Sequence, residues 1–333
     1  MNNDDMIKSG VHALILIGLI FVLLFLLTFT GVMKCSQLPL AGPAWCDVYW
    51  GIKTFTTGSP KVLIVYGDSG LGNPTGFGKG SLEEMLAEPT SLGVYADTLQ
   101  IDRVNFGNLR NYDLVIVERA RQIETKQLRA FIEYAMMPTG GTLIWTGDAG
   151  TEIGPNDHYL YTSDKDPDDD TNTIIGGWSR RDGDEMISFD ELLGVRPVDS
   201  EKVRFCELAS CLEGQPIFGG TLETEPSGNH PLIRGLSRTL PLYFFKDEDF
   251  AVVETLSGSI TTEVLSLDLG SDLNASGNWL ERSLPLIVTS GIGERVIYYA
   301  MPPEYYANPK LENAGKPPYL LPVENLYFGT LKG

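Results

Sequence analysis

The chain contains 333 residues, of which 44 are acidic and 25 basic, so its formal net charge at pH 7 is −19. The first 34 residues carry two acidic and two basic side chains, and the whole negative charge therefore lies on the part that follows. Such a surface repels nucleic acid and anionic lipid headgroups, which disfavours both as partners.

An uncharged apolar segment at residues 13–33 follows a short tail at residues 1–12. At about 1.5 Å per residue, a helix of this length crosses a hydrocarbon core of about 30 Å. A cleaved signal peptide has a shorter apolar region of about 7–15 residues. A lipoprotein would need small residues where Met33 and Lys34 precede Cys35. The segment therefore predicts a retained single-pass anchor in the lipid bilayer.

The linker at residues 34–60 is rich in Pro, Gly and aromatic residues, which suit the headgroup layer. The four cysteines of the chain form two closely spaced pairs, Cys35 with Cys46 and Cys206 with Cys211. This spacing indicates two local disulfides in an oxidising compartment. Four reduced, unrelated thiols are the alternative, and neither pair has the spacing of a zinc knuckle. With the sequon at Asn274, a glycosylation candidate, the pairs favour a cytoplasmic tail and an exoplasmic domain, either extracellular or periplasmic.

Apolar runs and helical periodicity alternate from residue 61 onward. Short apolar runs that end in turn residues predict buried parallel strands at residues 61–70, 113–118 and 142–147. Between them, a capping box and an amphipathic pattern predict helices at residues 81–88 and 124–137. This order predicts an α/β domain with a mostly parallel open sheet and flanking helices.

An acidic insertion at residues 151–181 interrupts this alternation. A second capping box, Ser188 with Glu191, begins a short helix that ends at Gly194. The remainder predicts a β-rich C-terminal portion, with strands at residues 251–255, 263–267, 284–289 and 295–300. A Pro-rich tail at residues 305–333 is predicted to be extended.

Three segments carry motifs beyond this pattern. They are a strand-helix-strand unit with a Gly-Gly turn at residues 112–150, an HP turn at residues 229–236, and a hairpin with a Gly-x-Gly turn at residues 285–304. In this order and spacing they resemble the class I glutamine amidotransferase-like superfamily, in the branch that includes trehalose-utilisation (ThuA-like) proteins and non-catalytic domains of membrane complexes. The resemblance implies an amidotransferase or flavodoxin-like fold over residues 61–304.

The turn after the third strand departs from the pattern of active amidotransferases, which carry a nucleophilic Cys there and use a His base downstream. In this chain the turn at residues 146–150 reads TGDAG and contains neither Cys nor Ser. The histidines are His12 beside the anchor, His158 in the acidic insertion and His230 in the HP turn, where a packing role is expected. The sequence therefore predicts a pseudoenzyme that keeps the fold without the glutaminase chemistry.

A Gly-rich loop at residues 67–80 follows the first strand, where open α/β sheets bind ligands. Asn73 and Gly80 break the spacing of a phosphate-binding loop. Asp68, Ser69 and Asp148 are candidate ligand-pocket residues, with structural turns as the alternative.

Four carboxylates in the acidic insertion stand at alternate positions, as in calcium loops: Asp164, Asp166, Asp168 and Asp170. Asp169 replaces the Gly that such loops place at their sharp turn. A bound cation would relieve the repulsion between the carboxylates, whereas the alternative is a solvated acidic loop. Calcium is the only cofactor that the sequence suggests.

No carboxylate pair, metal triad or nucleophile cluster in the sequence indicates catalysis. We expect a non-catalytic, membrane-anchored binding or scaffolding subunit of a membrane protein complex, whose partners are other membrane-protein subunits. The alternatives are an extracellular binder of glycans or small ligands, and a carbohydrate-active ThuA-like enzyme, which would need converging acid and base carboxylates.

Overall fold

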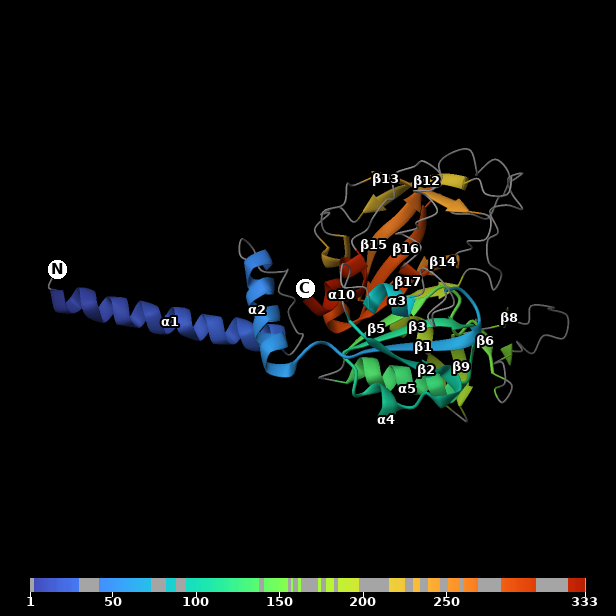
Figure 1. Cartoon of the computed structure of the whole chain (residues 1–333), viewed down its shortest axis with the longest axis horizontal. Helices are drawn as coiled ribbons and strands as arrows, with labels where there is room; N and C mark the ends of the chain where they lie inside the picture. Colours follow the sequence, from blue (N-terminus) through green and yellow to red (C-terminus); the bar gives the residue numbers. More distant parts are fainter. Residues whose placement is uncertain are drawn as a thin grey trace. The chain divides into compact units, whose positions relative to one another are not determined.

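The computed structural model describes residues 3–29, 42–72, 82–87, 94–137, 141–154, 157, 161–162, 173–174, 178–182, 185–197, 216–224, 230–233, 239–245, 251–257, 260–268, 283–303 and 323–332. The chain divides into two compact units (Figure 1). The first comprises Met1–Gly58 with Lys332–Gly333, and the second comprises Ser59–Leu331.

The first unit consists of helices α1 (Asn3–Phe29) and α2 (Gly42–Thr57). Within α1, the stretch Gly10–Thr28 is long and apolar enough to cross a membrane. Helix α2 occupies much of the predicted linker. Pro43 is tolerated there because it lies in the first turn, where its missing N–H leaves no intrahelical hydrogen bond unmade.

Five parallel strands form one half of the sheet in the second unit. Their spatial order is β2 (Ala96–Gln100), β1 (Val62–Ser69), β3 (Leu114–Ala120), β5 (Thr142–Thr146) and β17 (Val296–Tyr299). A row of four isoleucines crosses it in register: Ile64, Ile116, Ile144 and Ile297. All four are fully buried, as expected for apolar strands covered on both faces. The predicted α/β fold with an open sheet is confirmed, and these five strands are the parallel part of that sheet.

Helices cover both faces of these strands. On one face, Phe131 of α5 (Thr125–Met136) meets the ring of Trp145 with centroids 5.2 Å apart. Tyr299, paired with the neighbouring Thr146, points to the other face, because side chains alternate along a strand. There its hydroxyl donates to the Leu326 carbonyl oxygen of α10 (Val323–Lys332) at 2.6 Å. The remaining helices and helical turns are α3 (Leu82–Ala87), η2 (Ile101–Arg103), α4 (Phe106–Leu109), α6 (Phe189–Leu193), η3 (Pro231–Ile233) and η4 (Ile292–Glu294).

Helix α10 corrects the predicted conformation of the C-terminal tail. Residues 323–332 are helical rather than extended, and Leu326, Tyr327 and Phe328 are buried. The prediction rested on proline content, but the last proline is Pro322, directly before this helix. Burying the apolar side chains of residues 326–328 against the sheet is favourable, because it removes their surface from water.

The second half of the sheet is antiparallel and is built from the β-rich C-terminal portion. Its strands are β16 (Ser283–Ser290), β15 (Thr261–Asp268), β12 (Pro216–Thr224) and β13 (Thr239–Phe245), with β16 paired to β17. Short two-stranded pairs flank it: β4 (Gln122–Ile123) with β6 (Glu152–Ile153), β7 (Tyr161–Thr162) with β8 (Thr173–Ile174), β9 (Ser179–Asp182) with β10 (Glu185–Ser188), and β11 (Val195–Pro197) with β14 (Val253–Thr255). The predicted acidic insertion thus contains several short strands.

Candidate functional site

The strand order places a topological switch point between β1 and β3. Strand β1 lies between β2 and β3, so the connection that follows β1 leads to one side and the next connection returns to the other. Ligands of open α/β sheets bind outside the carboxyl ends of the strands at such a point. Among the sequence candidates, Asp68 and Ser69 are the last two residues of β1, and Asp148 follows the carboxyl end of β5.

The segment Gly67–Gly72 occupies this edge of the sheet with its own backbone. Beyond a bulge after Tyr66, Ser69 still pairs with Ala120 of β3. The Arg121 N–H donates to the Ser69 carbonyl oxygen at 3.1 Å, and the Arg119 N–H donates to the Leu71 carbonyl oxygen at 2.8 Å. The chain therefore runs over the end of β3.

Two glycines allow this close approach. A Cβ at Gly67 would lie 2.7 Å from the Arg119 carbonyl oxygen, and a Cβ at Gly72 would lie 2.7 Å from Oε2 of Glu118. Real Cβ atoms do not come so near, so a larger residue at Gly67 would push the segment away from β3, and one at Gly72 would displace the Glu118 carboxylate. Arg119 itself has φ +47°, a left-handed conformation that costs a non-glycine residue about 1–2 kcal/mol.

Leu71 fills the space over the turn that follows β5. Gly147 in this turn has φ +53°, and a Cβ there would lie 2.6 Å from Cδ1 of Leu71. Leu71 is itself buried. The turn after β5 is thus covered by an apolar side chain from the loop after β1.

Asp148 is buried and holds three segments together. Its Oδ1 accepts the Leu71 N–H at 3.0 Å, while Oδ2 accepts from Nε of Arg121 at 2.8 Å and lies 2.6 Å from Nη2. Nη1 of Arg121 also lies 3.4 Å from Glu152. Burial lowers the pKa of the Arg121 guanidinium, but Asp148 and Glu152 raise it by more, so the cation stays charged.

The candidate residues differ in accessibility. The side chains of Asp68 and Ser69 are exposed at the end of β1, whereas Asp148 is buried beneath Leu71. The structure links Ser69 to Asp148 through Arg121. The backbone N–H of Arg121 donates to the Ser69 carbonyl oxygen, and its guanidinium donates to the Asp148 side chain. The assignment of the three to a ligand pocket stays a prediction.

Glu118 is a fully buried carboxyl group at this edge that the sequence did not single out. It lies on β3 against Gly72, whose Cβ position is also 3.3 Å from Pro302. The sequence does indicate that Glu118 is buried, because this residue ends the apolar run LVIVE in a strand predicted to be buried on both faces. A charged residue at such a position is buried unless the strand ends before it.

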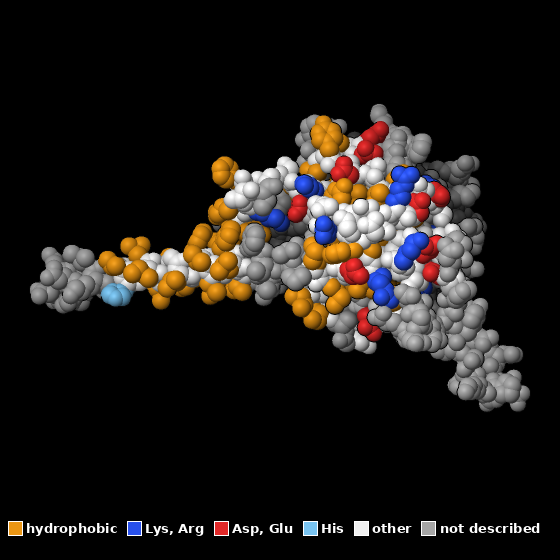
Figure 2. Space-filling model, turned by 90° about the horizontal axis from the view of Figure 1, so that it is seen from below, with side chains coloured by type: hydrophobic (Ala, Val, Ile, Leu, Met, Phe, Trp, Pro, Cys, Tyr) orange, Lys and Arg blue, Asp and Glu red, His pale blue; other side chains and the backbone are white. Residues whose placement is uncertain are grey.

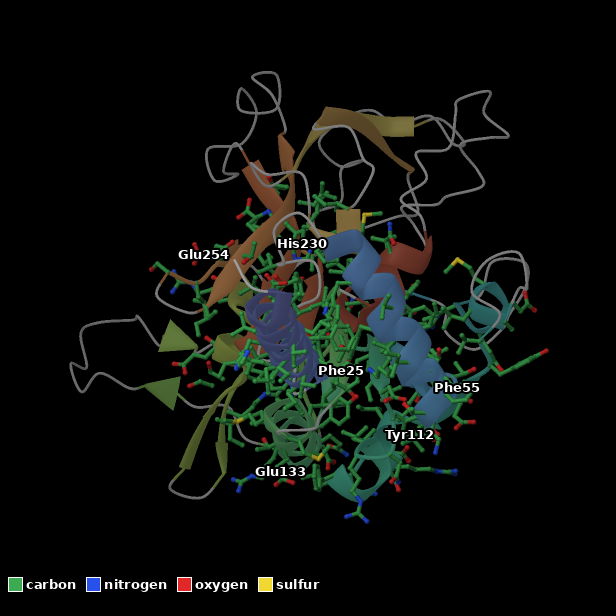
Figure 3. All side chains as sticks on the ribbon, turned by 90° about the vertical axis from the view of Figure 1, so that its left-hand side faces the viewer. Phe25, Phe55, Tyr112, Glu133, His230 and Glu254 are labelled. Carbon is green, nitrogen blue, oxygen red and sulfur yellow. The ribbon has the colours of Figure 1, made fainter. Side chains whose placement is uncertain are left out.

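His230, labelled in Figure 3, lies near the amino end of β17, because it contacts Glu294. Its Nδ1 accepts the Leu232 N–H at 3.3 Å, and Nε2 lies 3.0 Å from Glu294. Glu294 precedes β17 while Asp148 follows the parallel strand β5, so the two carboxylates lie at opposite strand ends. The buried His230 thus has one hydrogen bond within its own turn and one contact with a residue 64 positions away.

Several sequence candidates lie outside the described residues: Asp164, Asp166, Asp168, Asp170, Cys35, Cys206, Cys211, His158 and Asn274. Cys46 lies in α2, but its side chain is not described. Within the described ranges no group of three or more His, Cys, Asp or Glu could hold a metal ion. Calcium binding, the disulfides and glycosylation stay predictions.

Figure 2 shows Lys and Arg side chains interspersed with Asp and Glu over one face of the second unit. This visible face presents no continuous field of one sign. Hydrophobic side chains line the visible face of α1 in the same view. The two units thus differ in the kind of surface that they offer.

Comparisons with known proteins bear on the fold alone. No protein-family profile and no curated protein matches the chain. A ThuA-like protein from Bacteroides uniformis aligns over 81% of this chain and 91% of its own, with 14% identity and a TM-score of 0.44. A β-galactosidase from Rahnella sp. R3 aligns over 78% of this chain and 32% of its own, with 14% identity and a TM-score of 0.39. The carbohydrate deacetylase Agd3 aligns over 72% of this chain and 29% of its own, with 10% identity and a TM-score of 0.39.

Proposed function

We propose that this chain is a membrane-anchored, non-catalytic binding subunit of a membrane protein complex. In this proposal α1 holds the chain in the bilayer and the α/β unit is the docking module. The observation that carries it is that residues 67–72 run over the switch point between β1 and β3, the place at which such sheets bind their ligands.

The contacts of Asp148 support a structural role for this carboxylate. A general acid or base must come within about 2.6–3.2 Å of the proton that it transfers. Both oxygens of Asp148 are instead engaged by Leu71 and Arg121 inside the protein. A carboxylate held in this way neutralises the cation beside it and fixes two loops.

The anchor is supported by the surface of α1. Its stretch Gly10–Thr28 combines sufficient length with high hydropathy, and its apolar side chains are mostly exposed. Leucine and isoleucine exposed over about five helical turns would be costly in water and favourable in hydrocarbon. The exoplasmic orientation rests on the cysteine pairs and on Asn274.

Copurification tests the proposal. The tagged full chain is solubilised from native membranes in mild detergent, and quantitative mass spectrometry measures the ratio of each copurifying protein to the chain. We expect at least one membrane protein at a constant ratio through successive washes. Asp148→Ala, if the variant remains folded, should retain that partner, because the carboxylate contacts no partner in this account.

Two results would contradict the proposal. One is a chain that purifies alone from native membranes in every detergent tested. The other is an enzymatic turnover that Asp148→Ala abolishes while the thermal midpoint stays unchanged. In the second case the edge of the sheet would be an active site.

A second candidate function is the binding of glycans or other small ligands. It is favoured by the exposure of Asp68 and Ser69 at the carboxyl end of β1, since both could hydrogen-bond hydroxyl groups. A glycan array probed with the full chain tests it, with Asp68→Ala as the variant expected to lose binding. An array without signal would remove this candidate.

A further inference from the structure

Helix α2 packs against the last two turns of α1. The ring of Trp45 meets Phe21 with centroids 4.9 Å apart, and Tyr49 meets Phe25 at 5.9 Å. Trp45 donates its indole N–H to Oγ1 of Thr28 at 3.1 Å, in a buried hydrogen bond. Because Trp45 and Tyr49 are four residues apart, they form one face of α2, which is covered by α1.

These contacts determine how deep α2 lies along the apolar helix. Phe21, Phe25 and Thr28 all belong to the stretch Gly10–Thr28. Thr28 is seven positions after Phe21 in the helix, or about 10 Å farther along its axis. Helices that lie in a membrane interface bury their apolar face about 5–10 Å below the headgroups. A bilayer that covers this part of α1 therefore also covers the side of α2 that carries Trp45.

The direction of α2 agrees with this depth. Figure 1 shows α1 lengthwise with α2 crossing it, and Figure 3 shows α1 end-on with α2 extended across the view. The two views together show that α2 lies across α1 rather than beside it. When α1 crosses a membrane, α2 consequently runs along the membrane surface.

A second face of α2 carries apolar side chains that the protein leaves exposed. Val48, Ile52 and Phe55 are 47%, 36% and 92% exposed and follow one another at helical spacing. By helical geometry this stripe borders the face that packs on α1. It thus continues the exposed apolar surface of α1, where Leu14 and Leu19 also face outward.

We infer that α2 is a second membrane element, which lies in the bilayer interface and places the stripe Val48, Ile52 and Phe55 among the lipid acyl chains. The inference rests on one part of the proposed function, namely that α1 spans the bilayer. The partner is lipid rather than another protein, because the stripe shares its depth and its apolar surface with the part of α1 that hydrocarbon covers. Phe55, at the outer end of α2 in Figure 3, is the farthest insertion point from α1.

Tryptophan quenching in vesicles tests the inference. The full chain, as wild type, Phe55→Trp and Tyr95→Trp, is reconstituted into phosphatidylcholine vesicles with or without lipids brominated near the glycerol end of the acyl chain. The wild-type emission is subtracted to isolate the added tryptophan. We expect the emission added by Phe55→Trp to be mostly lost to the brominated lipid. Emission from Tyr95→Trp should persist, because position 95 is an exposed site (86%) of the α/β unit.

Sedimentation of the same vesicles after alkaline carbonate treatment separates the two proposals. A chain that is released from the vesicles would overturn both the anchor and the inference. A chain that stays in the pellet while Phe55→Trp remains as bright as Tyr95→Trp would overturn the inference alone. In native membranes, a photo-crosslinker at position 55 that labels a protein instead of lipid would also overturn it.

Discussion

The contact between Leu71 and Gly147 decides what the carboxyl edge of the sheet can hold. The two residues lie in different loops, yet Gly147 leaves the space that the Leu71 side chain fills. Gly147 also takes a positive φ that a glycine adopts without strain. Packing and backbone conformation at this turn therefore depend on the same pair of residues.

A double-mutant cycle measures this coupling. Leu71→Ala should lower the free energy of unfolding by about 2–5 kcal/mol, since it leaves a cavity over the turn. Gly147→Ala should cost at least about 1 kcal/mol, because its Cβ meets Leu71 at a strained φ. The double variant should be less destabilised than the sum by about 1 kcal/mol in denaturant titrations, because the smaller side chain at position 71 leaves room for the added methyl group. Strict additivity would show that Leu71 does not press on the turn.

Tyr134 predicts an alkaline limit to stability. It is fully buried and donates its hydroxyl to the Tyr112 carbonyl oxygen at 3.0 Å. Burial, followed by the negative charge of Asp113, raises the pKa of Tyr134 far above its usual value. Above about pH 10 the unfolded chain ionises this group and the folded chain does not, so stability falls as pH rises.

Guanidinium titrations between pH 9 and pH 11 check this expectation. Replacing Tyr134 with Phe should flatten the decline by up to about 1.4 kcal/mol per pH unit. The exposed Met136, replaced by Ala, removes no titratable group and is the control that should leave the slope unchanged. Equal slopes for both variants would show that Tyr134 ionises in the folded protein.

At the scale of the element, α5 shows what an amphipathic helix contributes to this fold. Phe131 is fully buried against Trp145, whereas Met136 at the end of the same helix is 73% exposed. Phe131→Ala should therefore destabilise the protein by about 3–5 kcal/mol, and Met136→Ala should change the free energy of unfolding by less than about 0.5 kcal/mol. Thermal and denaturant unfolding measure both. Similar losses for the two variants would mean that α5 is misplaced.

At the scale of the whole molecule, the division into two units predicts separable behaviour. The α/β unit has its own hydrophobic core and its own sheet. A chain that begins at Ser59 should therefore fold in solution and unfold at the same midpoint as the full chain in the same detergent. Differential scanning calorimetry measures the two midpoints. A chain from Ser59 that aggregates or melts early would show that α1 and α2 are needed for folding.

The cysteine pairs make a prediction about the compartment. Cys35 with Cys46 and Cys206 with Cys211 should be disulfide-bonded if the large unit lies on the exoplasmic side, where disulfides persist. Non-reducing peptide mapping of freshly isolated membranes identifies the linked peptides. Four free thiols would reverse the orientation of the chain in the membrane.

Local patterns were enough to determine the apolar helix α1, the strands β1, β3 and β5, and the helix α5. Their signals are an uncharged run, short apolar runs between turns, and a one-sided periodicity, all of which act between near neighbours. From these alone the α/β class followed. The sequence also located the loops after β1 and β5 as the candidate site, because strand ends and glycines can be read directly.

Other features were decided only by contacts between distant segments. Strand β2 is partly exposed and has no apolar run that would predict it. Helix α10 is stabilised by the burial of its apolar residues against the rest of the α/β unit. At the site, Leu71 reaches Gly147 and Asp148 from another loop. Asp157 accepts the Thr125 N–H at the start of α5 from 32 residues away. Such contacts depend on which surfaces remain available after the sheet has formed. The local sequence around each residue does not contain this information.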